Sequence, residues 1–334
     1  MIFLGLSLYA FGISYAQFKK HTQKYAKTLQ SQALTLKQTE LQNNIALRTP
    51  NPTLDFNVGR YDADFNDIDY GYAVGASQTI RTNGYLNALS SLSEAKTMLA
   101  KANIFQGRAS YMKMMEETYT QYVYQNKLLA LLQEEYKLSK KMTKIAKERY
   151  LNGAETRVSY LQAKTQTLSL KAQEHTTKQQ VQSLYYTLLA IGGYNKKVTL
   201  SKKFIYAMNA RVKGKARLNA RQKILLAKEK LYASQLRMNE NRFTSFDVSA
   251  GLEKEPGQSI LRVGISIPLP LRNNKEEEKA LSRLKMKQLQ LDRATLKLNN
   301  KSQRQLLKAN LKELTLQYQA LAVLKKNRTL LLVY

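Results

Sequence analysis

Residues 148–163 read Glu-Arg-Tyr-Leu-Asn-Gly-Ala-Glu-Thr-Arg-Val-Ser-Tyr-Leu-Gln-Ala, and this stretch decides the fold. The residues before it, 85–147, contain no Pro and a single Gly, and a second run rich in helix-forming residues follows it. Gly153 can adopt the left-handed conformation that ends a helix, and the hydroxyl of Thr156 can cap the next helix. The stretch therefore predicts a tight turn between two long antiparallel helices.

Apolar residues recur every seven positions in both long helical runs. Leu131, Leu138 and Ile145 keep this spacing before the turn, and a second set does so near the end of the chain, at Leu307, Leu314 and Leu321. This period is typical of a coiled-coil seam. At 1.5 Å per residue, the run before the turn predicts a rod of roughly 100 Å, far longer than a compact domain needs.

The composition fits long helices and a basic surface. The 334 residues include 5 Pro, 14 Gly, no Trp and no Cys, so disulfides and thiolate metal sites are excluded. Lys and Arg outnumber Asp and Glu by 54 to 24, which gives a net charge of +30. Such a balance favours an anionic partner such as nucleic acid, phospholipid or lipopolysaccharide, and it equally fits solvated helix faces that use Lys.

The N-terminus predicts export. Residues 2–16 are apolar and uncharged, and they are too few to span a bilayer as a helix. Ser14 and Ala16 fit the small-x-small cleavage rule, so we expect a secretory signal peptide cut after Ala16. No Lys or Arg precedes the apolar core, which departs from the usual pattern.

Two pairs of segments alternate apolar with small or polar residues, which predicts strands with one apolar face. These strands are expected at residues 53–60, 70–80, 244–253 and 259–268. Pro256 and Gly257 supply a turn within the second pair. Val-Gly-Ala-Ser at 74–77 superposes on Val-Gly-Ile-Ser at 263–266 at an offset of 189 residues, so the sequence predicts a tandem duplication.

The expected organisation is a signal peptide at 1–16, a first repeat at 17–195 and an incomplete second repeat at 196–334. The helices expected within the repeats are 18–47, 84–150, 155–190, 218–242 and 273–334. By the repeat offset, a second tip turn would fall just past Tyr334, so the returning helix of the second repeat is missing. We interpret this as a truncation.

The spacing Tyr150-x-x-Gly153-x-x-Thr156, followed by Leu-Gln-Ala at 161–163, resembles the helical-hairpin tip of TolC-like outer-membrane efflux proteins. The resemblance implies a passive duct in the outer membrane of a Gram-negative cell, with a periplasmic helical extension. Its partners would be a periplasmic adaptor, which meets the tip, and an inner-membrane RND-type pump. The residues that the resemblance assigns to adaptor contact are Tyr150, Gly153, Ala154, Glu155, Thr156 and Arg157.

The strands support the same interpretation. Four strands cannot close a barrel, and open edges in lipid leave backbone groups unpaired, so several copies must share one barrel. The resemblance implies a mainly α fold with a small β part, in which a homotrimer forms a 12-stranded barrel in outer-membrane lipid and a 12-helix tunnel. Without the last helix of the second repeat, each chain supplies three complete tunnel helices instead of four.

The substrate class rests on the strand-to-helix junctions. Pro268, Leu269 and Pro270 resemble the Pro-Leu-Pro segment of the CzcC-like, heavy-metal branch of the family. The equivalent junction of the first repeat is Gln78, Thr79 and Ile80. This favours heavy-metal cations as the cargo, while drugs, other small molecules or type I secretion substrates stay open as alternatives.

Other functions fit the sequence less well. There is no Cys nucleophile, no Gly-rich phosphate loop and no plausible Ser-His-Asp set, so neither an enzyme nor a cofactor is expected. With only His21 and His175, one chain cannot build an imidazole metal cluster. The basic window at 211–223 lacks aromatic side chains for stacking, which argues against nucleic acid. A secreted coiled-coil scaffold or adhesin would leave the duplicated strands unexplained.

Overall fold

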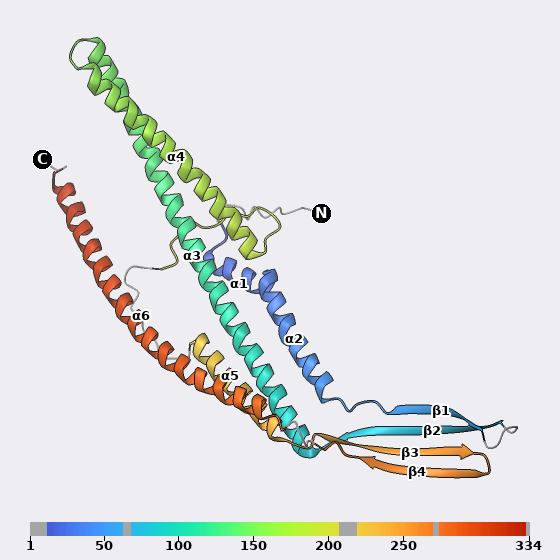
Figure 1. Cartoon of the computed structure of the whole chain (residues 1–334). Coiled ribbons are helices and arrows are strands. Elements are labelled where there is room, and N and C mark those ends of the chain that lie inside the picture. Colours follow the sequence, from blue (N-terminus) through green and yellow to red (C-terminus); the bar gives the residue numbers. More distant parts are fainter. Residues whose placement is uncertain (1–11, 63–67, 207–218, 270–273, 332–334) are drawn as a thin grey trace, which may run out of the picture. The chain divides into compact units, whose positions relative to one another are not determined.

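The computed structural model describes residues 12–62, 68–206, 219–269 and 274–331 (Figure 1). The chain divides into two compact units, and each of them combines two separate stretches of sequence. Unit 1 comprises Met1–Lys37 and Ile104–Arg217, and unit 2 comprises Gln38–Asn103 and Leu218–Tyr334. These units do not follow the boundaries of the predicted repeats, because strands from both repeats pair in one sheet in unit 2.

Helices make up most of the described chain, and their bounds differ slightly from those predicted. They are α1 (Tyr15–Tyr25), α2 (Lys27–Leu47), α3 (Asn83–Leu151), α4 (Arg157–Gly192), α5 (Ala220–Glu240) and α6 (Glu276–Leu331). Helix α3 has 69 residues, which corresponds to roughly 100 Å. Among the described residues, no helix combines the length and the apolarity needed to cross a membrane.

The single helix predicted for residues 18–47 is wrong, because the chain breaks at Ala26. This residue has extended backbone angles, φ −62° and ψ 119°, and only 1% of it is exposed. Gly193, which ends α4 with φ 68°, lies against the break. A Cβ atom on Gly193 would come within 2.8 Å of the Tyr25 carbonyl oxygen. The break therefore depends on a contact with a distant segment, which local sequence does not reveal.

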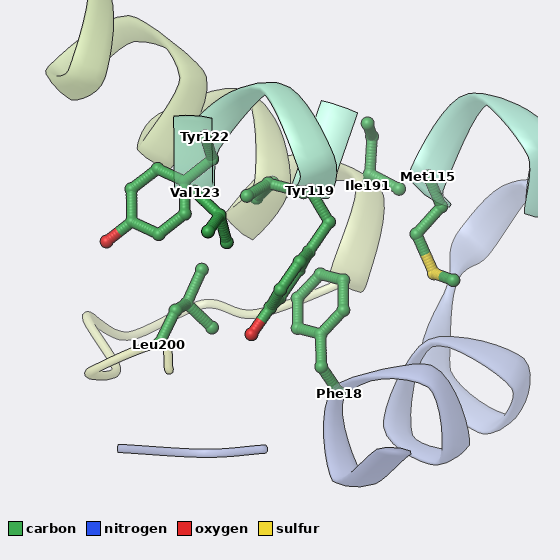
Figure 2. Close-up of a cluster of buried hydrophobic side chains, with 8 residues drawn as sticks. Phe18, Met115, Tyr119, Tyr122, Val123, Ile191 and Leu200 are labelled. Atoms are coloured by element: carbon green, nitrogen blue, oxygen red, sulfur yellow. The ribbon is translucent and has the colours of Figure 1, made fainter. Parts of the chain in front are cut away.

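The core of unit 1 joins α1, α3, α4 and the segment after α4 (Figure 2). Its buried side chains are Phe18, Met115, Tyr119, Tyr122, Val123, Leu188, Ile191 and Leu200. Leu200 belongs to residues 196–219, whose irregular and basic sequence predicts a surface segment; the prediction is wrong for Leu200, which is 2% exposed, whereas the described neighbours are irregular and mostly exposed. The basic window at 211–223 lies partly outside the described residues.

Tyrosine hydroxyls in this core bond to backbone carbonyls. Tyr119 donates to Ser201 over 2.8 Å, and Tyr111 donates to Ile191 over 2.6 Å. Burial raises the pKa of Tyr119 to about 12. Each hydroxyl thus remains protonated and hydrogen-bonded, as burial of a polar group requires.

Glu116 is the centre of a polar cluster at the edge of this core. It accepts hydrogen bonds from the hydroxyls of Tyr15 (2.7 Å) and Tyr206 (2.8 Å) and from Lys19 Nζ (2.9 Å). Burial alone would raise the pKa of Glu116, but these hydrogen bonds and the charge of Lys19 lower it below its usual value. The cluster fixes α1 and the segment after α4 onto α3.

The first described residues are also packed. Ile13 pairs with Leu200 in a parallel bridge, and Ser14 caps α1 with a capping box that involves Gln17. Cleavage after Ala16, as the sequence predicts, would remove these contacts together with the Tyr15 ring. Residues 1–11 of the predicted signal peptide lie outside the described residues.

Unit 2 contains one antiparallel sheet whose strands lie side by side in Figure 1, in the order β1-β2-β3-β4. The strands are β1 (Thr53–Asp62), β2 (Ile68–Arg81), β3 (Ser245–Glu255) and β4 (Gln258–Ser266). The structure confirms four antiparallel strands. The last strand ends at Ser266, two residues before its predicted end at residue 268. Pro268 cannot continue the strand because it has no amide hydrogen to donate to a ladder. Strands β2 and β3 join the two hairpins, so the edges are β1 and β4.

The register places unlike side chains on the two faces of the sheet. Near the hairpin turns, one row of direct neighbours consists of Val58, Tyr72, Lys254 and Ser259. The next two rows towards the helices are apolar. The side chains of this apolar face include Leu54, Phe56, Val74, Leu252, Leu261, Val263 and Ile265. All seven are exposed in the single chain.

Helices α5 and α6 pack together through one stripe of α6. Leu225 of α5 is buried against Leu289 and Leu296, which lie seven residues apart on α6. Arg293 forms an ion pair with Glu229 across the same contact. The packing thus uses leucines spaced by seven residues, but they are not the predicted set on this helix, Leu307, Leu314 and Leu321.

Candidate functional site

The tip of the α3–α4 hairpin is the first candidate site, and it begins where α3 ends. The amide of Gly153 donates to the carbonyl of Tyr150 over 3.1 Å, and that of Ala154 donates to Arg149 over 2.8 Å. These two bonds form a Schellman motif, which satisfies the last carbonyls of a helix. Gly153 has φ 72°, and nothing lies within 4 Å of the position that its Cβ would occupy. The predicted left-handed turn is confirmed.

The second helix begins as predicted for a threonine cap, although at residue 157 rather than 155. The Oγ1 of Thr156 accepts a hydrogen bond from the Ser159 amide over 3.3 Å. Because Thr156 is the cap, Glu155 remains outside the helix. The rings of Tyr150 and Tyr160 stack across the turn, with centroids 6.1 Å apart and planes within 6°. Caps and stacked rings together make this a rigid turn.

Side chains at the tip are directed to solvent in the single chain. Ala154, Thr156 and Arg157 are exposed, and Glu155 is half-buried. Two neighbouring apolar groups are also exposed: Val158 to 63% and Leu161 to 44%. A shallow hollow runs along this side of α4, lined by Val158, Leu161, Gln162, Thr165, Gln166 and Ser169. The tip therefore presents an apolar and amide-rich surface next to two charges.

Below the tip, the two helices are joined by hydroxyl groups instead of leucines. Thr143 of α3 donates to the Ala163 carbonyl over 3.0 Å, and its oxygen lies 2.8 Å from the Thr167 hydroxyl. Ser139 lies 2.6 Å from the same Thr167 oxygen. A heptad pattern of apolar residues does not predict this contact, because it depends on hydroxyl groups. The contact through hydroxyl groups leaves Leu138 and Ile145, which belong to the predicted seam, exposed to 63% and 50%.

The strand-to-helix junctions are the second predicted site, and the two junctions differ in structure. Gln78, Thr79 and Ile80 do not form a loop. They lie within β2, just before its last residue, Arg81. Gln78 Nε2 donates to the Pro50 carbonyl over 2.9 Å, and the Thr79 hydroxyl donates to Asp247 over 2.5 Å. Pro268 and Leu269 follow β4, with Leu269 exposed to 67%. Pro270 lies outside the described residues.

The polar face of the sheet carries a charge opposite to that of the whole chain. Among the side chains that the structure describes, its carboxylates outnumber its guanidinium groups five to two. The carboxylates are Asp55, Asp69, Asp247, Glu253 and Glu255, and the guanidinium groups are Arg81 and Arg262. Arg262 neutralises Glu253 through a 2.6 Å ion pair. The alternation within each strand is predictable from the sequence, but the net charge of the face is not, because it depends on the register between the four strands.

One known family matches the part of the chain that contains β1, β2, α3, the tip and α4. A family model described as "Outer membrane efflux protein" matches residues 21–193. The chain belongs to the outer membrane efflux protein family. This efflux protein is therefore a protein of the outer membrane, and its family is one of channel proteins.

Solved channels share the fold of this efflux protein. The outer membrane protein VceC from Vibrio cholerae has 15% sequence identity and a TM-score of 0.63, and the match covers 82% of this chain and 74% of VceC. The Campylobacter jejuni CmeC outer membrane channel has 14% identity and a TM-score of 0.64, covering 85% and 67%. The Neisseria gonorrhoeae MtrE outer membrane channel has 14% identity and a TM-score of 0.63, covering 82% and 67%.

The comparisons support the TolC-like fold, and nothing in them singles out a heavy-metal branch. A comparison with curated protein sequences gives no match.

Proposed function

We propose that three copies of this efflux protein form one channel, which conducts substrate passively across the outer membrane. The observation that carries the proposal is the sheet, whose order leaves β1 and β4 as edges within the described chain. In lipid, an unpaired backbone group costs several kcal/mol, so the edges require partners. Three copies supply twelve strands, which is enough to enclose a lumen.

The open helical stripes support the same assembly. Leu284, Leu291 and Leu298 of α6 repeat every seven residues and are 65–69% exposed in the single chain. Leu131, Leu138 and Ile145 of α3 repeat in the same way and are 50–63% exposed. Heptad leucines are seldom left in water over such a length, and packing against another copy would bury them.

The assembly can be tested with cysteines, because the natural chain has none. Asn57→Cys on the β1 edge is combined with Ile260→Cys, Arg262→Cys or Gly264→Cys on the β4 edge. At least one pair should give disulfide-linked trimers in outer-membrane fractions. Asn57→Cys with Ala73→Cys, which are partners within one chain, is the control that should give only monomers. The absence of intermolecular bands from all three edge pairs, with the control pair oxidised, would reject the shared sheet.

We propose that the helical tip is where a periplasmic adaptor binds, which would couple the channel to an inner-membrane pump. The support is local: a rigid turn, an exposed apolar hollow on α4, and Glu155 and Arg157 beside it. A rigid surface of this kind loses little conformational entropy when a partner binds.

A pair of glycines gives a matched test of the tip. Gly153 and Gly257 both have positive φ angles, and neither has an atom within 4 Å of the Cβ position. Valine at either site costs a similar strain of about 1–2 kcal/mol. Gly153→Val should abolish adaptor pull-down and efflux while trimers persist, whereas Gly257→Val and Gly153→Asn should retain both. Equal efflux from Gly153→Val and the wild type would contradict the tip assignment.

We propose that the cargo is cationic, with heavy-metal cations favoured and cationic drugs as the alternative. The support is the acidic polar face of the sheet, which would line the lumen when the apolar face meets lipid. Fixed carboxylates raise the local concentration of cations in a pore.

Ion selectivity tests this substrate class. In planar bilayers under a KCl gradient, the reversal potential should indicate preference for K⁺, and the double variant Asp55→Asn with Asp247→Asn should reduce it. Asp55→Glu with Asp247→Glu keeps the charges and should keep the preference. Anion preference in the wild type would reject cationic cargo. Export assays with Zn²⁺ and with a cationic dye then distinguish metal ions from drugs.

A further inference from the structure

The apolar face of the sheet changes character at its hairpin end. Its rows at Leu54 and Phe56 are apolar, but Arg60 and Lys254 lie at the end next to the turns. Among the side chains that the structure describes on this face, these two alone are charged, and both are basic. The sheet carboxylates whose side chains the structure describes belong to the opposite face, so the two faces differ in charge as well as the two ends.

Register places two tyrosines between these cations. Arg60 is the direct partner of Tyr70, and Lys254 is the direct partner of Tyr72, in the adjacent row. Both tyrosines are exposed, to 67% and 54%. Strands β1 and β3 are two strand spacings apart, or about 10 Å, which long basic side chains on either side can bridge around one phosphorylated headgroup.

Lys254 has a neutral partner only. Its Nζ donates to the hydroxyl of Ser259 over 3.2 Å, and it forms no ion pair with any described residue. A serine hydroxyl leaves the ammonium charge uncompensated and has an oxygen that can bind the same anion. The hydroxyl also holds the lysine side chain across the strands at the rim of the sheet.

The rim is separated from the opposite end of the sheet by about the height of an apolar membrane band. Lys254 is eight residues from Phe246 along β3, which corresponds to about 26 Å. Apolar bands of outer-membrane barrels are about 25 Å tall and end in aromatic girdles. Helices α3 and α6 continue from the other end of the strands, so the basic rim is at the end away from them.

We propose that Arg60, Lys254, Tyr70 and Tyr72 bind the phosphate of an outer-leaflet lipid, of the lipid A type. Charge complementarity selects this partner, because a basic rim above an apolar band matches a phosphorylated headgroup above acyl chains. The proposal rests on insertion of the sheet into the outer membrane by the trimeric channel. Its role would be to fix the depth of the barrel and to seal it against the outer leaflet.

The test uses the purified trimer in nanodiscs and measures retained lipid by native mass spectrometry. The probes are bis-phosphorylated lipid A and its dephosphorylated form. Lys254→Gln should weaken retention of the phosphorylated form about fivefold, and Arg60→Gln with Lys254→Gln about thirtyfold. Arg262→Gln, on the opposite face of the same sheet, is the matched control and should leave retention unchanged.

The outcomes separate the inference from the proposed function. A conducting trimer that retains both lipid forms equally, or a double variant that binds like the wild type, would overturn the lipid site alone. Displacement of lipid A by millimolar inorganic phosphate would also overturn it, because a free anion would then suffice. The loss of trimers and conductance in the wild type would instead reject the channel itself.

Discussion

Unit 1 and unit 2 differ in how many of their apolar side chains are buried within one chain. Unit 1 has a core of eight buried side chains whose tyrosine hydroxyls have partners within the chain. Unit 2 buries three leucines between α5 and α6 and leaves the leucines and valines of its sheet exposed. Unit 1 therefore completes a core within one chain, although its α3 stripe stays open, and under the proposed assembly lipid and other copies of the chain cover the exposed side chains of both units.

The largest test of this difference is Tyr119→Ala in the core of unit 1. Tyr119 is fully buried, so the change leaves a cavity and an unpaired Ser201 carbonyl, and should reduce the free energy of unfolding by about 3–5 kcal/mol. Hydrogen exchange of peptides from α3 and α4 measures the loss. Tyr124→Ala is the control, since Tyr124 is 50% exposed on the same helix. Equal protection in both variants would mean that the cluster is not the core.

A pair of leucines on α6 sharpens the comparison within unit 2. Leu289 is 5% exposed against α5, whereas Leu291, two residues on, is 65% exposed. Leu289→Ala should destabilise the protomer by about 2–4 kcal/mol. Leu291→Ala should change protomer stability by less than about 0.5 kcal/mol, yet lower the fraction of trimer at a given detergent concentration. Urea unfolding and light scattering measure the two effects, and trimers insensitive to Leu291→Ala would contradict the open-seam interpretation.

Glu116→Gln tests the polar edge of unit 1. It removes charge-assisted hydrogen bonds and should cost about 1–3 kcal/mol at neutral pH. The folded state lowers the pKa of Glu116, so this stabilisation is present above the usual value of 4.5 and is lost as the pH falls through the folded-state pKa. The difference in unfolding free energy between wild type and variant should therefore shrink on acidification. A difference that grows towards low pH would contradict the pKa shift.

The smallest effect concerns the start of α1. Tyr15→Phe removes only the hydroxyl that donates to Glu116 and should cost about 0.5–1.5 kcal/mol, measured by urea unfolding. The intact mass of the exported chain is measured first, and it establishes whether the mature chain includes Tyr15. A mature chain that begins at Gln17 would show instead that unit 1 is stable without these contacts.

Much of this architecture follows from local chemistry. The turn at Gly153 and the cap at Thr156 are predictable because each depends on one residue and its near neighbours. The four strands are predictable because alternation is a property of a single strand. Their predicted ends are within two residues of the observed ones.

Other features depend on which segments meet. The break at Ala26 needs Gly193, and the burial of Leu200 needs Tyr119 and Phe18. Likewise, the heptad leucines of α6 are equivalent in the sequence, and only packing against α5 distinguishes Leu289 from Leu291.

The amino-acid sequence by itself determined the periods, the turns and the family of this protein, because hydrophobic spacing and glycine conformation are properties of short segments. Tertiary structure alone decided the register between β2 and β3, and with it the acidic face and the basic rim of the sheet. The reason is that a shift of one residue exchanges the two faces of a strand, and only hydrogen bonds between distant segments fix that shift.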